Sequence, residues 1–233
     1  MTKLKGVSFF CPAYYDEKNI VSVVDKADKV LSETCEDYEI VVINDGSPDK
    51  TKDVLDSLAL RYPKLKSIHH ARNLGYAEAL KAGFKNAKKY EFILFTDGDN
   101  QYDIAYFKDM IKYIDDYDAV ITYRIRNANN FIRCIISWMF NRVLNILFWQ
   151  PFKDLSSSFR LVKRDLIKTS EFVSKGIFLP CEIVLTLKHK KYRIKEIPIV
   201  TRRREYGRSS SLLPKNFIGV FFDMLNVRLN LFK

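Results

Sequence analysis

The sequence has few of the residues that build zinc sites or disulfide frameworks. Its 233 residues include only four cysteines and three histidines. No Cys-x-x-Cys pair and no histidine cluster occurs among them. Zinc ligands usually come in closely spaced pairs, so the spacing argues against a zinc site. The scattered cysteines are typical of a reducing compartment, and Cys11, which lies in an apolar run, is expected to be a small core residue.

Long uncharged segments, repeats and low-complexity linkers are also lacking. No stretch of about 20 residues is free of charge, which argues against a membrane-spanning helix. The first residues lead directly into a strand-like run, so we expect no signal peptide. A chain of 233 residues without a linker can bury a sizeable core, and we expect one composite domain.

The charge balance is strongly basic. Lys and Arg number 39 against 28 Asp and Glu, a net charge of +11, whereas a hydrophobic content of 47% is ordinary for a folded protein. A basic surface suggests phosphate-bearing partners such as nucleotides, nucleic acid or an anionic membrane face, although it can also serve solubility alone. Because no nucleic-acid recognition motif is present, we expect no nucleic-acid partner.

Strand and helix patterns alternate through the first half of the chain. Apolar strand-like runs occupy 7–14, 38–43, 65–69, 90–95 and 119–123, and helical spacing occupies 17–31, 49–60, 76–87 and 104–114. This alternation predicts an α/β fold with a mostly parallel sheet covered by helices on both faces. The second half predicts helices over 129–149 and 180–190, strands over 159–162 and 193–200, and an apolar, aromatic tail over 212–233.

A pair of acids follows one of the buried strands. The run Phe92–Phe95 leads into Asp97-Gly98-Asp99. Two carboxylates at the exposed end of a strand can hold one hard divalent cation, and that cation can bridge a diphosphate. The alternative is a polar turn without a ligand. Tyr14 and Asp45 fall at the ends of two other strands, and ligands of parallel sheets lie beyond such ends, so we expect one shared site.

Several motifs occur in the order of one known family. They are Pro12-Ala13-Tyr14-Tyr15-Asp16-Glu17, Ile43-Asn44-Asp45-Gly46-Ser47-Pro48-Asp49, Asn73-Leu74-Gly75-Tyr76, Asp97-Gly98-Asp99, and the run from Arg204 to Ser209. In these motifs the chain resembles the inverting glycosyltransferases of family 2 with the GT-A fold. Within that family it is most similar to the polyprenyl-phosphate sugar transferases, such as dolichol-phosphate mannose synthase. The resemblance covers residues 7–211 and departs from the family pattern at Tyr15, Ile121 and Ser210.

The resemblance implies a fold, a reaction and a division of the chain. The fold is a GT-A, Rossmann-like domain over 1–211, with a nucleotide-binding half at 1–120 and an acceptor-binding half at 121–211. An amphipathic tail at 212–233 follows as an interfacial helix. The implied reaction is metal-dependent transfer, with inversion, of a sugar from a UDP- or GDP-sugar to a polyprenyl phosphate, and the implied metal is Mg²⁺ or Mn²⁺.

Site residues follow from the resemblance, position by position. Nucleotide contacts are assigned to Pro12, Tyr14, Asp16, Ile43, Asp45, Asp97, Gly98, Asp99 and Gln101. Metal contacts are assigned to Asp97 and Asp99, acceptor-phosphate contacts to Arg124, Arg133 and Ser137, and catalysis to Asp97, Asp99, Arg124 and Arg204. Asn73 is expected to cap the helix that follows it, because Asn is a preferred cap residue.

Asp154 and Glu182 have two interpretations. Either is the general base that an alcohol acceptor would need, or both are structural partners of Arg160 and its neighbours. A phosphate acceptor is already ionised and needs no base. Transfer to a sugar hydroxyl in glycan assembly therefore remains the nearest alternative function, and a non-catalytic nucleotide-binding membrane module is the other.

Two aromatic segments suggest a membrane surface. The predicted helix over 129–149 and the tail carry aromatic residues beside arginines and lysines, a pattern typical of interfacial helices, although apolar stripes more often pack as core. Together with the basic charge, this predicts a peripheral protein on the cytoplasmic face of an anionic membrane.

Overall fold

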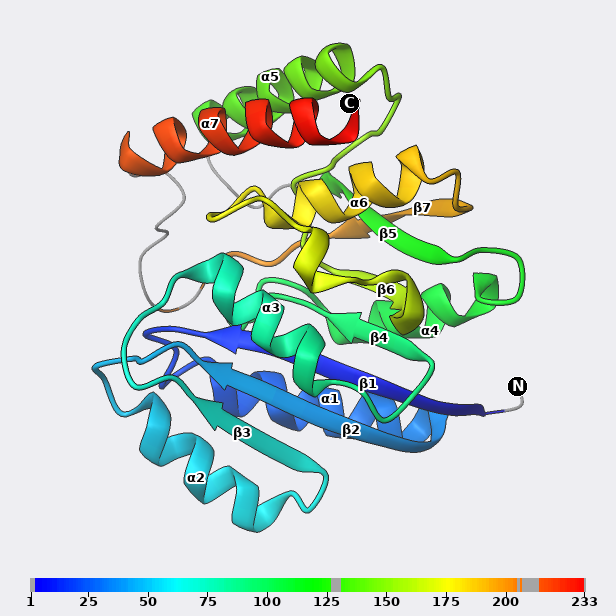
Figure 1. Cartoon of the computed structure of the whole chain (residues 1–233). Coiled ribbons are helices and arrows are strands. Elements are labelled where there is room, and N and C mark those ends of the chain that lie inside the picture. Colours follow the sequence, from blue (N-terminus) through cyan, green and yellow to red (C-terminus); the bar gives the residue numbers. More distant parts are fainter. Residues whose placement is uncertain (1–2, 127–130, 205, 207–213, 233) are drawn as a thin grey trace.

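The fold is built on a single seven-stranded sheet. A computed structural model describes residues 3–126, 131–204, 206 and 214–232 (Figure 1). The sheet order is β3-β2-β1-β4-β6-β5-β7. The strands are β1 (Leu4–Ala13), β2 (Cys35–Asn44), β3 (Leu65–His69), β4 (Phe92–Phe95), β5 (Ala119–Arg126), β6 (Arg160–Lys163) and β7 (Ile194–Val200).

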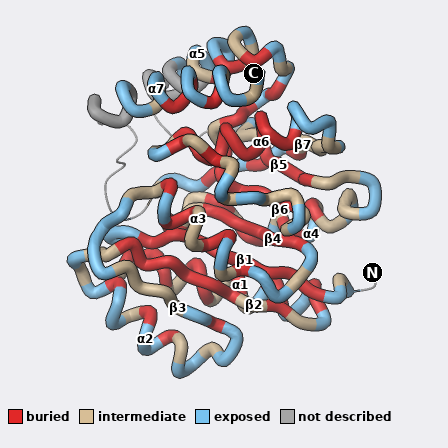
Figure 2. Tube along the Cα trace, viewed as in Figure 1, coloured by how far each residue is buried: buried red, intermediate tan, exposed pale blue. Residues whose placement is uncertain are grey.

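All strand pairs are parallel except those that involve β6. β1 pairs with β2 and β4, β2 with β3, and β5 with β7, whereas β6 runs antiparallel between β4 and β5. The central strands are buried (Figure 2). Phe9, Phe10 and Cys11 of β1, whose side chains alternate between the two faces, are all fully buried. Such near-continuous apolar strands are typical of a parallel sheet covered on both sides. The prediction of a mostly parallel α/β sheet flanked by helices is confirmed.

Helices cover the two faces of the sheet as separate layers. The α-helices are α1 (Ile20–Thr34), α2 (Thr51–Arg61), α3 (Tyr76–Asn86), α4 (Phe107–Met110), α5 (Phe131–Phe148), α6 (Leu179–His189) and α7 (Pro214–Leu231). Buried side chains of α1, α2 and α4 pack with Phe9 on one face, and those of α3 and α6 pack with Phe10 on the other. α5 and α7 form an outer layer that packs against α6 (Figure 1).

Two local predictions are wrong. The helix expected over 104–114 is a four-residue α4 between two 3₁₀ turns. Its buried residues Ile104, Phe107 and Met110 recur every three positions, which matches the three-residue turn of a 3₁₀ helix. Asn73 does not cap α3, which starts after Gly75 with no side-chain cap. The N–H groups of Leu74 and Gly75 bind a carboxylate instead.

Candidate active site

The acidic cluster lies where β1 and β4 end, side by side in the sheet. Asp16 and Asp99 are buried there. Gly98 lies tightly against the end of β1 and the turn after it, because a Cβ atom at this position would lie 2.4 Å from the carbonyl oxygen of Pro12 and 3.4 Å from Asp16 Oδ2. Asp16 Oδ2 also accepts from the N–H of Tyr14 at 3.1 Å. The turns after β1 and β4 therefore meet. They bring together five residues that the resemblance assigned to the nucleotide: Pro12, Tyr14, Asp16, Gly98 and Asp99.

Asp97 is held by a hydroxyl from another element. The Tyr76 hydroxyl, at the start of α3, donates to Asp97 Oδ1 at 2.6 Å and lies 3.4 Å from Ser158 Oγ. Burial, together with the neighbouring charge of Asp99, raises the pKa of Asp97 to about 6. Two carboxylates this close repel each other, and a positive charge between them offsets that repulsion.

Asp99 is bound by an arginine from a distant part of the chain. Arg204 Nη2 lies 2.9 Å from Asp99 Oδ2, and the N–H of Gln101 donates to Asp99 Oδ1 at 3.2 Å. The segment before Arg204 runs alongside, since the N–H of Arg202 donates to the Gln101 carbonyl at 2.8 Å. The structure thus places Gln101 and Arg204, two residues that the resemblance assigned to the site, beside the acid pair.

The donor set suits a cation that is shared with a substrate. Among the described residues, no group of three or more His, Cys, Asp or Glu side chains could hold a metal unaided. Mg²⁺ is commonly bound by one or two carboxylates, with the remaining positions filled by substrate phosphates and water. Asp97 and Asp99 supply two such hard oxygen donors, so these residues fit a metal that completes its coordination on a diphosphate.

Asp45 forms a second wall of the site. Its carboxylate binds His70 Nδ1 at 2.7 Å and the N–H groups of Leu74 and Gly75 at 2.9 Å each. Gly46 has a φ of +61°, and a Cβ there would lie 2.2 Å from the backbone of Arg72. Asp45 and Gly46 therefore fix the loop of residues 70–75. His70 was missed in the sequence, where its only signal is its place directly after β3.

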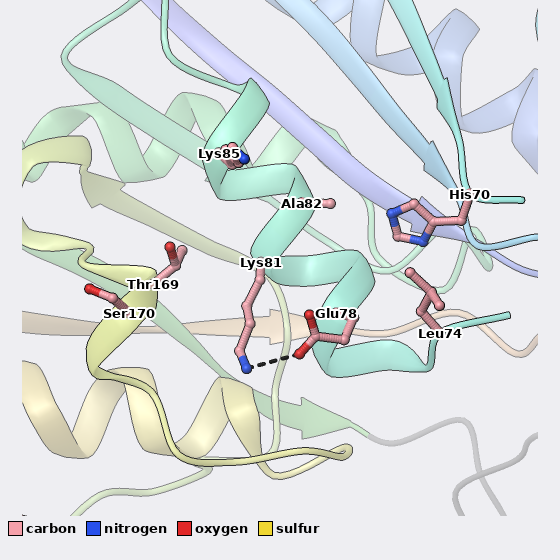
Figure 3. Close-up of a pocket in the computed structure, with 8 residues that line it drawn as sticks. All are labelled: His70, Leu74, Glu78, Lys81, Ala82, Lys85, Thr169 and Ser170. Atoms are coloured by element: carbon pink, nitrogen blue, oxygen red, sulfur yellow. Dashed lines mark hydrogen bonds and ion pairs between the residues drawn. The ribbon is translucent and has the colours of Figure 1, made fainter. Parts of the chain in front are cut away.

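Ile43 supports the site from below. Its side chain is fully buried in the core under α3, so it does not face a ligand. Tyr14, by contrast, is 42% exposed at the end of β1 and is available to a ligand. A separate pocket of about 350 Å³ lies along α3 near residues 169–170, with His70 at its edge (Figure 3). Neither Asp97 nor Asp99 lines this pocket.

Arg124 and Asp154 form a buried ion pair at the end of β5. Arg124 Nε donates to Asp154 Oδ2 at 2.6 Å and Nη2 to Oδ1 at 3.0 Å. Ser156 and Asn141 donate to the same carboxylate. Burial alone would favour the neutral acid, but the hydrogen bonds from Arg124 and Ser156 outweigh it and lower the pKa of Asp154.

Glu182 is engaged by backbone. Glu182 lies on α6 and is 1% exposed, and its two carboxylate oxygens accept from the N–H groups of Val173 at 2.8 Å and Ser174 at 2.9 Å. Within the described part of the chain, Arg160 donates to the carbonyls of Pro180 and Leu155 and to neither acid. The expectation that Asp154 or Glu182 pairs with Arg160 is therefore wrong, although both acids do have structural partners.

Some predicted residues lie outside the description. Arg133 and Ser137 are on α5, but their side chains are not among those described. The same holds for residues 207–213, which include the loop positions after Tyr206.

Comparison with known proteins agrees with this architecture. Residues 8–170 match the family model described as glycosyl transferase family 2. CsbB of Bacillus subtilis (strain 168) is 33% identical over 179 residues, which is 74% of this chain and 54% of CsbB. The dolichyl-phosphate beta-glucosyltransferase ALG5C of Trichomonas vaginalis is 24% identical over 212 residues, 82% of this chain and 62% of ALG5C. The chain thus spans less than two thirds of these two relatives.

Solved structures share the fold. Glucosyl-3-phosphoglycerate synthase from Mycobacterium tuberculosis, in complex with Mn²⁺, UDP and phosphoglyceric acid, superposes with a TM-score of 0.75 at 15% identity, covering 96% of this chain and 78% of the other. The same enzyme with Mg²⁺ and UDP gives a TM-score of 0.71. The sheet and its acidic edge define a GT-A fold of the glycosyltransferase class. By its match over residues 8–170, the chain belongs to glycosyl transferase family 2.

We expect Tyr76→Phe to weaken metal-dependent nucleotide binding roughly tenfold, because partners that orient a metal ligand typically contribute that much. The measurement is calorimetric titration of UDP or GDP with and without Mn²⁺. Tyr62→Phe is the matched control, since the Tyr62 hydroxyl binds Asp25 at 2.6 Å, away from the site. Unchanged affinity in Tyr76→Phe would mean that Asp97 is oriented without this hydroxyl.

Proposed function

We propose that the protein transfers a sugar, with inversion, from a UDP- or GDP-sugar to a polyprenyl phosphate. One observation carries the choice of acceptor: the two acids considered as general bases are both occupied. Asp154 is held as an anion by Arg124, and Glu182 accepts two backbone N–H groups. An attacking hydroxyl would need a free base, whereas a phosphate oxygen attacks without one.

The remaining residues have roles in the same reaction. Mg²⁺ or Mn²⁺, when bound by Asp97 and Asp99, would supply positive charge for the diphosphate leaving group. Tyr14, Asp16 and Asp45 surround the nucleoside, with Pro12, Gly98 and Gln101 beside them, and Arg204 donates to the diphosphate. Arg124 with Arg133 and Ser137 orients the acceptor phosphate, so its oxygen attacks the anomeric carbon opposite the leaving group. The similarity to a dolichyl-phosphate beta-glucosyltransferase supports a lipid phosphate acceptor.

The outer helices support binding to an anionic membrane. Each helix has one buried face, with Leu144 on α5 and Val227 on α7 fully buried, and one exposed apolar face. The exposed face includes Trp138, Ile146 and Trp149 of the first helix and its C-terminal end and Phe221, Phe222 and Leu229 of the second. Arginines lie over the rings: the guanidinium carbon of Arg142 is 5.4 Å from the ring centre of Trp138, and that of Arg228 is 4.6 Å from the ring centre of Trp149. In the described residues no helix is long and apolar enough to cross a bilayer. We propose peripheral binding on the cytoplasmic face.

We expect Ile146→Glu to reduce binding to vesicles of anionic phospholipid by roughly tenfold or more, because it places a charge where an apolar side chain enters the bilayer interface. Co-sedimentation measures the bound fraction. Leu60→Glu is the control, since Leu60 is a 90% exposed apolar residue on α2. Equal loss in both variants would assign the effect to net charge and not to the α5 face.

A paired-acceptor assay tests the transfer itself. The full chain is incubated with UDP- or GDP-sugars, Mn²⁺, and either a polyprenyl phosphate or the polyprenol of the same length. Product from the phosphate alone is the expected result. Transfer to the polyprenol would instead show that a hydroxyl can be the acceptor and would support the hydroxyl-acceptor alternative, and nucleotide binding without any transfer would support a non-catalytic module.

A further inference from the structure

The contact between Arg204 and Asp99 involves an oxygen that the proposed metal site also needs. Arg204 Nη2 lies 2.9 Å from Asp99 Oδ2, and the other oxygen, Oδ1, already accepts from the Gln101 N–H. Asp99 is buried, so its carboxylate has little other surface to offer. A guanidinium and a divalent cation are both positive, and they cannot occupy the same buried oxygen side by side without strong repulsion.

The segment that leads to Arg204 is held in place by contacts of its own, which do not involve Asp99. This segment, residues 200–204, is called the strap below. The N–H of Val200 donates to the Tyr106 hydroxyl at 3.1 Å, and the N–H of Arg202 donates to the Gln101 carbonyl at 2.8 Å. Arg202 also pairs with Asp103 at 2.5 Å. None of these contacts uses Asp99, so the Arg204 side chain can change partners while the strap stays attached.

We propose that Arg204 competes with the divalent cation for Asp99, and that a bound diphosphate relieves the competition by giving Arg204 a new anionic partner. This inference rests on the proposed donor site and adds a coupling between its two ligands. Metal alone must displace Arg204 from Asp99 and leave the guanidinium without that partner. Metal with a nucleoside diphosphate displaces Arg204 onto phosphate oxygens, which arginine binds well. Each ligand therefore strengthens binding of the other by the same factor.

Arg204 thereby favours a site that binds the cation together with the diphosphate over a site that binds the cation alone. Cation without nucleotide is disfavoured at Asp97 and Asp99, whereas the complete metal and diphosphate pair is favoured. The consequence is a site that fills in a concerted way instead of holding a resident metal. The small donor set agrees with this, since two carboxylates leave most coordination positions to the substrate.

The test measures Mn²⁺ binding without turnover. The electron paramagnetic resonance signal of free Mn²⁺ is titrated against the full chain, first with Mn²⁺ alone and then with saturating UDP or GDP. Four proteins are compared: wild type, Arg204→Gln, Arg204→Lys and Arg203→Gln. Arg203 is the exposed neighbour in the same strap, so its variant removes the same charge without the Asp99 contact.

We expect Arg204→Gln to bind Mn²⁺ alone at least about tenfold more tightly than wild type, because a cation no longer competes for Asp99. The increase in Mn²⁺ affinity that UDP or GDP causes should be smaller in this variant than in wild type. Arg204→Lys, which keeps a positive charge, should stay near wild type, and so should Arg203→Gln.

Two results would overturn the proposal. One is Mn²⁺ affinity in Arg204→Gln that is equal to or weaker than wild type in the absence of nucleotide. The other is an equal gain in Arg203→Gln, which would assign the effect to general charge. If nucleotide and Mn²⁺ bind normally to wild type in either case, only the competition fails. If no protein binds nucleotide with Mn²⁺, the proposed donor site fails as well.

Discussion

Asp99→Ala is expected to lower the rate of sugar transfer by roughly a thousandfold or more. The charge that a cation provides to a departing diphosphate is worth several kcal/mol, and about 1.4 kcal/mol corresponds to a tenfold change in rate. Asp99 is one of the two carboxylates assigned to the metal, so its removal leaves Asp97 as the other. Asp99 Oδ2 is also the atom that Arg204 contacts. The measurement is initial-rate transfer at saturating donor, together with metal-dependent nucleotide binding.

Asp103→Ala separates loss of the metal ligand from loss of the strap. Asp103, in the loop after β4, pairs with Arg202 of the strap, so its removal loosens the strap but leaves both acids of the pair. We expect its transfer rate to stay within several-fold of wild type, because a half-exposed ion pair contributes at most about 1 kcal/mol. Transfer by Asp99→Ala above a tenth of the wild-type rate would remove Asp99 from the catalytic machinery.

Asp154→Ala is expected to cost about 3–5 kcal/mol of unfolding free energy. It leaves the Arg124 guanidinium buried without its carboxylate, and breaking one side of a buried ion pair typically costs that much. Urea unfolding followed by circular dichroism measures the change. Asp165→Ala is the matched control, because the Asp165 side chain is 81% exposed in its pair with Arg164, and such surface pairs contribute about 0–1 kcal/mol.

The loss of unfolding free energy in Asp154→Ala should also depend on pH and become smaller in acid. The folded state lowers the pKa of Asp154, so the stabilisation is fully present above the unfolded value of about 4. It is lost as pH falls through the lower, folded pKa. The stability gap between wild type and Asp154→Ala should therefore be constant from pH 5 upward and narrow in acid. A gap that stays constant to the onset of acid unfolding would mean that packing, not charge, carries the effect.

Local pattern was enough to predict most of the fold. The strand predicted over 65–69 coincides with β3, and the alternation of strands and helices gave the parallel sheet, because buried parallel strands have a distinctive apolar sequence. The prediction of one α-helix over 104–114 was wrong because apolar residues spaced three apart fit both an α-helix and a 3₁₀ helix. The antiparallel direction of β6 also had no local signal, since strand direction depends on the path of the connecting chain.

The candidate site was predicted in outline but not in its contacts. The acids after β1, β2 and β4 were found because ligands lie beyond the ends of parallel strands. The partners of those acids were missed, including Tyr76, His70 and Ser158, because each comes from a different part of the chain. The pairing of Arg124 with Asp154 was also missed, and it gives both residues a structural role beside the assigned ones.

The position of β6 has a consequence for how the chain folds as it is made. β3, β2, β1 and β4 form a parallel block that is complete by residue 95, while β5, among the described strands, bonds to β6 and β7 alone. Until residues 160–163 are synthesised, β4 is an open edge with unpaired backbone groups and no route to β5. Open edges of this kind attract other chains. The four residues of β6 join this block to the rest of the sheet, and we expect their pairing with β4 to protect the nascent N-terminal block from aggregation.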